Sequence, residues 1–188
     1  MKQYLKIDEW KVIEDQFHPA YNEITESIFS LGNGRMGQRG SFEETYTGKT
    51  LQGNYVAGIY YPDKTRVGWW KNGYPEYFAK VLNAANWNGL SIQVGGEEVD
   101  LHTSTIHSFY RELNMKGGYI LRTCEISLQN GKRLAIESIR LNSMADDESG
   151  RNGIDRHCFS IGIAAPFCVD NEIATTSEHV MTASRRLR

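Results

Sequence analysis

Two pairs of adjacent acids are the residues best suited by type to do chemistry, because enzymes that cleave glycosidic bonds commonly use two carboxylates. Glu97-Glu98 follows Gly95-Gly96, a combination typical of a tight turn with charged residues that face solvent. Glu43-Glu44 lies in a glycine-rich stretch and is the carboxylate pair that we single out for test, although a structural role is favoured. These pairs do not by themselves assemble an enzyme mechanism.

Aromatic side chains are the second group with a chemical use. The chain is rich in them between Gly53 and Phe78, and an aromatic face flanked by polar groups is a common way to bind a sugar. For any single ring, packing in a core or an interface is the favoured alternative. As a group, they predict contact with a carbohydrate or with another domain. The candidate contact residues are Tyr55, Tyr60, Tyr61, Trp69, Trp70, Lys71, Asn72 and Tyr74.

Two glycine motifs match nucleotide sites only in outline. Gly32-x-Gly34-x-x-Gly37 would indicate a dinucleotide site if a helix opened on it, but Gly40 stands where that helix should begin. The position about twenty residues further on also lacks the required acid. Gly48-Lys49-Thr50 matches the end of a P-loop, but Glu43 occupies the position of the first glycine of that loop. Turns and bulges in a β-rich domain are the favoured interpretation.

Composition narrows the classes of partner and location. The chain has 188 residues and a net charge of −2, with no basic stripe of the kind that binds nucleic acid. Cys124, Cys158 and Cys168 are predicted to be buried reduced thiols, and the histidines show no close metal-ligand spacing. Neither a signal peptide nor a membrane span is recognisable. We therefore expect a cytoplasmic protein without metal or cofactor.

The elements that position these residues begin with a region of alternating apolar and polar side chains. Residues 4–17 are predicted to form one strand or two, with Leu5, Ile7 and Val12 as candidate core positions. The proline at position 19 ends this region because it cannot donate to a strand ladder. Residues 24–31 have the spacing of a short helix, but the β-rich surroundings favour a strand.

Two hairpins are predicted in the middle of the chain. Residues 90–101 alternate on both sides of a Gly95-Gly96 turn, and residues 120–136 alternate around Asn130-Gly131, the favoured type I′ pair. Successive hairpins of this kind make an antiparallel sheet. The fold class is therefore predicted to be all-β.

The second hairpin contains an irregularity in its pattern. Its apolar phase shifts from Leu134 and Ile136 to Ile139 and Leu141. An extra residue in one strand produces such a shift. We expect a β-bulge near residues 137 and 138.

The last part of the chain is predicted to add strands to the sheet. Residues 144–154 are polar and charged, which is typical of a surface loop. Residues 159–167 alternate large apolar with small side chains and predict a long strand, and residues 172–176 predict a short one. We expect one domain over residues 1–179, followed by a frayed tail, rich in arginine, over residues 180–188.

A longer pattern in the same region resembles a known family. The segments GNGRMGQRGSFEE, LQGNYVAGIYYPDKT and VGWWKNGYPEYFAKVLNAAN are similar to the amino-terminal region of glycoside hydrolase family 65, and specifically of its maltose phosphorylases. The similarity runs from about Trp10 to about Met115 and continues more weakly toward His179. Members of that family are much longer chains.

The resemblance implies a fold and an activity. The fold is an antiparallel β-sandwich of the supersandwich, galactose mutarotase-like type, here as an incomplete domain. In the family a helical linker and an (α/α)6 barrel follow, and the barrel carries the catalytic acid and the phosphate pocket. The implied reaction is inverting phosphorolysis, in which inorganic phosphate is the co-substrate and maltose gives β-glucose 1-phosphate and glucose. We expect this chain to be inactive alone.

The resemblance also implies partners. They are the chain's own barrel domain, the disaccharide substrate and a second copy in a homodimer. Residues 55–61 and 69–74 are our choice for the domain contact, on the basis of their surface chemistry. Two other hypotheses remain open: a free-standing carbohydrate-binding module that uses the same aromatics, and a nucleotide-binding oxidoreductase. The last requires residues 37–42 to begin a helix on a parallel sheet.

Overall fold

The computed structural model describes residues 4–66 and 75–142, together with the backbone of short strands between positions 159 and 181. The predicted loop at residues 144–154 and the predicted tail at 180–188 lie outside this part, apart from the end of the last strand. The same holds for the side chains of Cys158 and Cys168.

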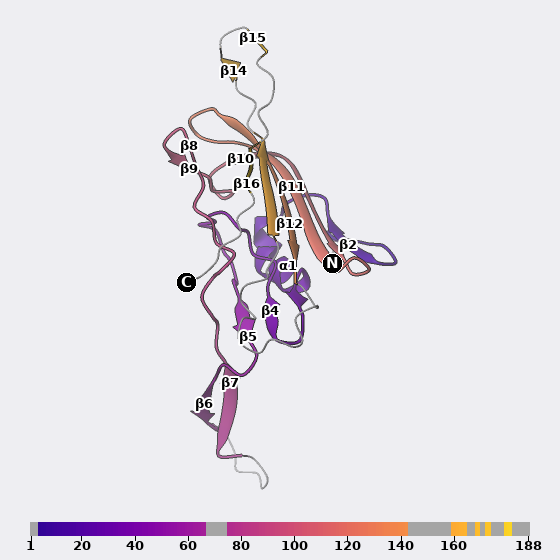
Figure 1. Cartoon of the computed structure of the whole chain (residues 1–188), viewed down its shortest axis with the longest axis vertical. Coiled ribbons are helices and arrows are strands. Elements are labelled where there is room, and N and C mark those ends of the chain that lie inside the picture. Colours follow the sequence, from indigo (N-terminus) through magenta and orange to yellow (C-terminus); the bar gives the residue numbers. More distant parts are fainter. Residues whose placement is uncertain are drawn as a thin grey trace.

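A seven-stranded antiparallel sheet is the main layer of the molecule (Figure 1). Its strand order is β1-β2-β10-β11-β12-β13-β16. The central strands follow one another as hairpins, as the prediction of successive antiparallel pairs requires. The strands are β1 (Lys6–Ile7), β2 (Lys11–Glu14), β10 (Thr105–Asn114), β11 (Tyr119–Ser127), β12 (Arg133–Leu141), β13 (Phe159–Ala164) and β16 (His179–Met181).

A layer of short elements lies on one face of this sheet (Figure 1). It contains a 3-10 turn and a short helix, a three-stranded sheet and two small hairpins, while a third small hairpin, formed by Cys168–Val169 and Glu172–Ile173, lies beyond the end of the large sheet at the top of Figure 1. One hairpin, β6–β7, extends beyond the rest of the molecule at the bottom of Figure 1. The elements are η1 (Pro19–Tyr21), α1 (Asn22–Ile28), β3 (Leu31–Gly32), β4 (Met36–Gln38), β5 (Asn54–Val56), β6 (Tyr60–Lys64), β7 (Tyr77–Val81), β8 (Gln93–Val94), β9 (Glu97–Glu98), β14 (Cys168–Val169) and β15 (Glu172–Ile173).

The hydrophobic core lies between the two layers. On β11, Ile120, Cys124 and Ile126 alternate with less buried residues, so one face of the strand points inward. Across from them, Phe42 packs edge-on against Tyr46 with ring centroids 5.2 Å apart. The predicted antiparallel all-β sandwich is therefore confirmed. The buried core residues are Phe42, Tyr46, Val99, Leu101, Phe109, Cys124, Ile126, Leu128, Leu134 and Ile136.

Both predicted hairpins are present, with one difference in turn geometry. Gly95 and Gly96 have φ values of 63° and 82°, which suits a tight turn that needs the left-handed region. In the other hairpin, the N–H of Gly131 donates to Leu128 O at 3.0 Å, so the predicted Asn130-Gly131 pair does not form the centre of the turn by itself. Gly131 instead follows the turn with a φ of 81°.

The prediction of a strand over residues 24–31 is wrong, because α1 occupies residues 22–28. Its buried positions are Asn22, Thr25 and Glu26, which have helical spacing but polar side chains. Ile24 and Ile28 are exposed. The helical spacing noted in the sequence was therefore the correct signal, although its isoleucines lie on the exposed face of the helix.

The predicted bulge near residues 137 and 138 is also wrong. β12 pairs with β11 in continuous register from Arg133 to Leu141. The inward face simply changes from apolar to polar, with Leu134 and Ile136 followed by Ser138 and Arg140. The irregularity in this sheet lies instead on β10, between residues 106 and 108.

Two further points concern the periphery. Ile7, a predicted core position, is 74% exposed, while Leu5 and Val12 are half-buried. Within the described ranges, no helix has both the length and the apolar character needed to cross a membrane.

The core assignment predicts a contrast between two substitutions. Leu134→Ala should lower the free energy of unfolding by about 2–5 kcal/mol, because Leu134 is only 2% exposed and its loss leaves a cavity. Ile7→Ala should change that free energy by no more than about 0.5 kcal/mol. Urea unfolding followed by circular dichroism measures both. Equal losses in the two variants would contradict the assigned core.

Candidate functional site

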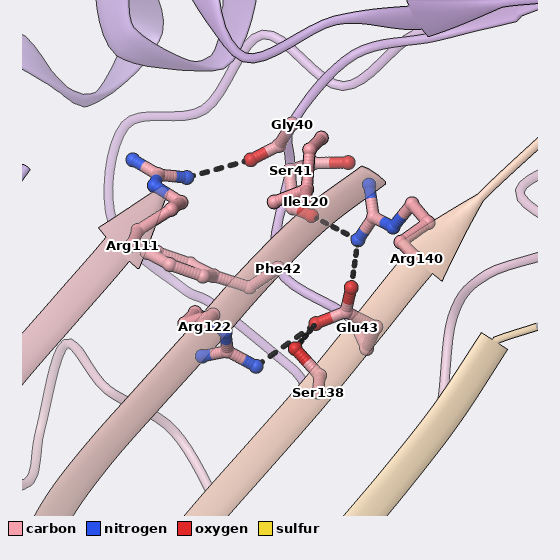
Figure 2. Close-up of a pocket in the computed structure, with 9 residues that line it drawn as sticks. All are labelled: Gly40, Ser41, Phe42, Glu43, Arg111, Ile120, Arg122, Ser138 and Arg140. Atoms are coloured by element: carbon pink, nitrogen blue, oxygen red, sulfur yellow. Dashed lines mark hydrogen bonds and ion pairs between the residues drawn. The ribbon is translucent and has the colours of Figure 1, made fainter. Parts of the chain in front are cut away.

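Glu43 and Glu44, the acids singled out from the sequence, are buried in a network of arginines. Figure 2 shows Glu43 between Arg122 and Arg140. Arg122 donates to both oxygens of Glu44 at 2.5 Å and to Glu43 Oε2 at 2.9 Å. Arg140 forms an ion pair with Glu43 Oε1, and Ser138 Oγ donates to Glu43 Oε2 at 3.3 Å. Glu43 is therefore held by groups from β11 and β12, and Glu44 by Arg122 of β11.

The same network fixes the backbone of the glycine-rich stretch. Arg140 donates to the carbonyl oxygens of Arg39 and Ser41, at 2.9 and 2.7 Å. Arg111 donates to Gly40 O at 2.7 Å and pairs with Glu14 Oε2 at 2.6 Å. A side chain at position 40 would begin 2.4 Å from Phe29 O, so the close approach requires glycine there.

The electrostatics of this network argue against a catalytic role for Glu43. Burial alone would raise the pKa of its carboxyl, but Arg140 and Arg122 outweigh burial and lower the pKa to about 2. Burial would likewise lower the pKa of Arg122, but Glu44 and Glu43 raise it. A general acid needs a pKa near the working pH, so Glu43 is a fixed anion and not a proton donor.

The space beside the network also excludes a sugar. The cavity between residues 40–43 and the inward side chains of β10, β11 and β12 has a volume of about 10 Å³. That volume suits one water molecule at most. Glu43 and Glu44 thus connect the two layers of the domain.

A larger open pocket lies between α1 and β4, and it contains Tyr55 from the sequence-based set. Its volume is about 230 Å³. Arg39 Nε donates to Tyr55 Oη at 3.3 Å, and Arg39 Nη1 donates to Ser27 Oγ. A side chain at Gly53 would begin 2.5 Å from Tyr55 Oη, so this glycine leaves room for the tyrosine ring. The lining residues are Ser27, Ser30, Leu31, Gly37, Gln38, Arg39 and Tyr55.

Sequence reasoning missed most of this pocket. Arg39 belongs to the GQRG segment that carried the family resemblance, and this was the available signal. Ser27 and Ser30 come from α1 and the turn after it, a region predicted to be a strand. Without the helix, nothing placed these serines near Arg39.

The β6–β7 hairpin, which we call the aromatic arm, carries two other predicted contact residues. Tyr60 and Tyr61 are each 58% exposed, although neighbours on a strand point to opposite faces. No residue of the arm lines the Tyr55 pocket, so the two are separate features. Trp69, Trp70, Lys71, Asn72 and Tyr74 lie outside the described residues.

The aromatic arm exposes large apolar side chains on both faces, beside an ion pair between Asp63 and Lys80. Its exposed large apolar side chains are Ile59, Tyr60, Tyr61, Tyr77, Phe78, Val81 and Leu82. An isolated two-stranded hairpin is at best marginally stable in water, and a patch of this kind commonly marks an interface. The chemistry of the arm thus favours contact with another protein surface. Among the described side chains, no group of three His, Cys, Asp or Glu residues could hold a metal ion.

The Glu43 network predicts a stability that depends on pH. Its folded pKa of about 2 lies below the ordinary value of 4.5, so its stabilising contribution is present above about pH 4.5 and is lost as pH falls toward 2. Glu43→Gln should lower the free energy of unfolding at pH 7 by about 3–5 kcal/mol, because it removes one partner from a buried ion pair. The difference from the wild type should shrink between pH 4.5 and 2.

Urea unfolding at several pH values measures this effect, and Glu125→Gln provides the matched control. Glu125 lies on β11, as does Arg122, the partner of Glu43, but the Glu125 side chain is 56% exposed and its ion pair with Arg133 is 3.8 Å long. The control should therefore change the free energy of unfolding by less than about 1 kcal/mol. A Glu43→Gln loss no greater than the control's would show that the network does not hold the layers together.

Comparison with known proteins gives a consistent family assignment. Residues 12–151 match the family described as glycosyl hydrolase family 65, N-terminal domain. A maltose phosphorylase of Bacillus subtilis (strain 168) is 50% identical over 143 residues, which cover 76% of this chain and 19% of that protein. An α,α-trehalose phosphorylase of Thermoanaerobacter brockii is 34% identical over 144 residues, covering 73% of this chain and 18% of the relative. A kojibiose phosphorylase of the same organism is 32% identical over 139 residues, with coverages of 74% and 16%.

A solved structure, "Putative kojibiose phosphorylase from human microbiome", has a similar fold, with a TM-score of 0.73 and 31% identity. The likeness covers 88% of this chain and 21% of that one. This chain spans between 16% and 19% of the length of the three curated relatives. Because the family match, the 50% identical relative and the structural likeness agree, the chain belongs to glycosyl hydrolase family 65, and residues 12–151 correspond to the N-terminal domain of that family.

Proposed function

We propose that this chain is the N-terminal, non-catalytic domain of an inverting phosphorylase that converts maltose and inorganic phosphate to β-glucose 1-phosphate and glucose. The observation that carries the choice of maltose is the 50% identity to a maltose phosphorylase. The kojibiose and trehalose phosphorylases of Thermoanaerobacter brockii reach 32% and 34%.

The proposed reaction needs groups that this domain does not offer. In inverting phosphorolysis, one carboxylic acid protonates the glycosidic oxygen while phosphate attacks the opposite face of the sugar. Glu43, with a pKa of about 2, carries no proton to donate at neutral pH, and the cavity beside it has no room for a sugar. The acid and the phosphate-binding groups are therefore proposed to belong to an (α/α)6 barrel domain of the same enzyme, with phosphate as co-substrate and no cofactor.

The aromatic arm is the proposed contact with that barrel domain. Tyr60 and Tyr61 expose apolar area that no described residue covers, and tyrosine is one of the residues that dominate the energetics of interfaces. The same surface offers a contact for a homodimer. A cytoplasmic location is part of the proposal, and the buried free thiol of Cys124 is compatible with a reducing compartment.

Carbohydrate binding by the domain itself is the second candidate function. The observation in its favour is the open pocket in which Tyr55 lies beside polar side chains. Titration of the 188-residue chain with maltose and glucose, followed by tryptophan fluorescence, separates the two candidates. Saturable binding supports a binding module, and no response supports a domain that acts only with its barrel.

The maltose proposal predicts the activity of the longest open reading frame that contains this chain. That enzyme should release glucose from maltose only when phosphate is present, with a kcat/KM at least about tenfold above those for kojibiose and trehalose. The 188-residue chain alone should release none. A preference for another disaccharide, or glucose release without phosphate, would contradict the proposed reaction.

The arm proposal predicts an effect that depends on the rest of the enzyme. The double substitution Tyr60→Ser and Tyr61→Ser should leave the stability of the 188-residue chain nearly unchanged, because both rings are exposed. In the complete enzyme it should cost about 2 kcal/mol or more of stability, since buried interface tyrosines commonly contribute that much. Thermal unfolding of both forms measures the difference.

Ile7→Ser is the matched control for the arm, because Ile7 is also an exposed apolar residue of a short strand. It should have little effect in either form. If the tyrosine variant behaved like this control in the complete enzyme, the arm would not be a domain contact.

A further inference from the structure

Arg39 differs from the other arginines that face the layer boundary. Arg111, Arg122 and Arg140 each form an ion pair with a glutamate. Within the described part of the chain, Arg39 has no such carboxylate partner, and no acidic residue lines its pocket. Its positive charge is therefore not balanced locally.

The backbone holds Arg39 in a fixed place. Its N–H donates to Gly53 O at 2.8 Å, and its carbonyl accepts from Arg140 Nη1 at 2.9 Å. The side chain is half-buried and is further oriented by its hydrogen bonds to Tyr55 and Ser27. A guanidinium held in one orientation loses little conformational freedom when it binds a ligand.

Two groups of this pocket, on Arg39 and Tyr55, have free donors. Arg39 uses Nε and Nη1 within the protein, and its Nη2 has no hydrogen-bond acceptor among the described residues. Tyr55 Oη accepts from Arg39, which leaves its own O–H available to donate. Ser27 and Ser30 donate to the carbonyl oxygens of α1, so their hydroxyl hydrogens are already used. Two free donors beside an unbalanced positive charge match an anion with several acceptor oxygens.

We propose that this pocket binds a compact phosphate-type oxyanion, held by the Arg39 guanidinium and the Tyr55 hydroxyl. Its volume of about 230 Å³ is below the range of about 300–1,000 Å³ typical of drug-sized ligands, which favours a small ligand. Inorganic phosphate and the phosphoryl group of a monosaccharide phosphate share the required chemistry. This inference goes beyond the proposed function, because every contacting residue belongs to this domain and binding requires no catalysis.

Titration of the 188-residue chain tests the proposal, with amide and Arg Nε–H shifts recorded by NMR at constant ionic strength. The probes are inorganic phosphate, glucose 1-phosphate and glucose. Saturable shifts at residues 37–40 are expected with at least one of the two phosphates, and a much weaker response with glucose. Saturation by inorganic phosphate identifies the free anion as sufficient, and saturation by glucose 1-phosphate alone identifies a sugar phosphate.

Variants separate the pocket from non-specific charge effects. Arg39→Gln should weaken binding of the phosphate probe by roughly tenfold or more, because it removes charge-assisted hydrogen bonds. Tyr55→Phe should weaken it by a few-fold while keeping the ring, so it also decides the outcome if Arg39→Gln fails to fold. Arg133→Gln, which removes the same charge from an exposed side chain, should bind like the wild type.

Three results would overturn the proposal: no saturable shift with either phosphate, equal binding by the wild type and both pocket variants, or glucose binding as tight as the phosphates. Phosphate-dependent maltose cleavage is measured separately on the longer enzyme. Failure of that assay with intact phosphate binding here would count against the proposed function alone.

Discussion

The structure depends on one constraint, the buried charge network that joins the glycine-rich stretch to the large sheet. Glu43 and Glu44 bind Arg122 of β11, Glu43 also pairs with Arg140 of β12, and Arg140 holds the carbonyl oxygens of Arg39 and Ser41. Removing such charges from water is costly, so a network of this kind survives only when each charge meets a partner in good geometry. We infer that its main contribution is specificity, since Arg111, Arg122 and Arg140 all find acceptors in the short segment from Gly40 to Glu44.

The network and the hydrophobic core divide the space between the layers. Toward one end of β12, Leu134 and Ile136 pack into the aromatic and aliphatic cluster around Phe42. Toward the other end, Ser138 and Arg140 meet Glu43. Phe42 links the two regions, because the guanidinium of Arg122 lies 5.0 Å from the centre of its ring. Apolar burial thus provides the driving force of folding, and the charged end fixes how the layers align.

The two surfaces that we propose to be functional, the Tyr55 pocket and the aromatic arm, lie outside this network and the core. Arg140 holds the carbonyl of Arg39, and the Arg39 side chain donates to Ser27 of α1 and Tyr55 of β5. The aromatic arm leaves the domain after β5 and carries its tyrosines away from the core. The Tyr55 pocket is small and polar, whereas the aromatic arm is a large apolar surface, so the two suit different partners. This division agrees with a domain that supports a catalytic body and offers a separate small-ligand site.

The sequence by itself determined the features that depend on local chemistry. Neighbouring residues determine the Gly95-Gly96 turn, the hairpin at Gly131 and the alternation of β11. Together these features imply an antiparallel all-β sheet. The family was also recognisable, because the segments around GQRG and the aromatic arm form a long specific pattern. These features need no knowledge of distant contacts.

Only the tertiary structure decided what polar residues do when they are buried. The partners Glu43 and Arg140 lie 97 positions apart in the sequence, and Arg122 is 78 positions from Glu44. No local sequence pattern therefore predicts that these residues pair. Residues 24–31 were predicted as a strand because the β-rich surroundings outweighed their helical spacing, and the buried polar face of α1 gave no apolar signal against that choice. The change to polar side chains on β12 was likewise predicted as a bulge. Apolar periodicity in a sequence predicts burial only where the buried side chains are apolar. In this domain, part of the boundary between the layers consists of buried charged side chains, which that periodicity does not detect.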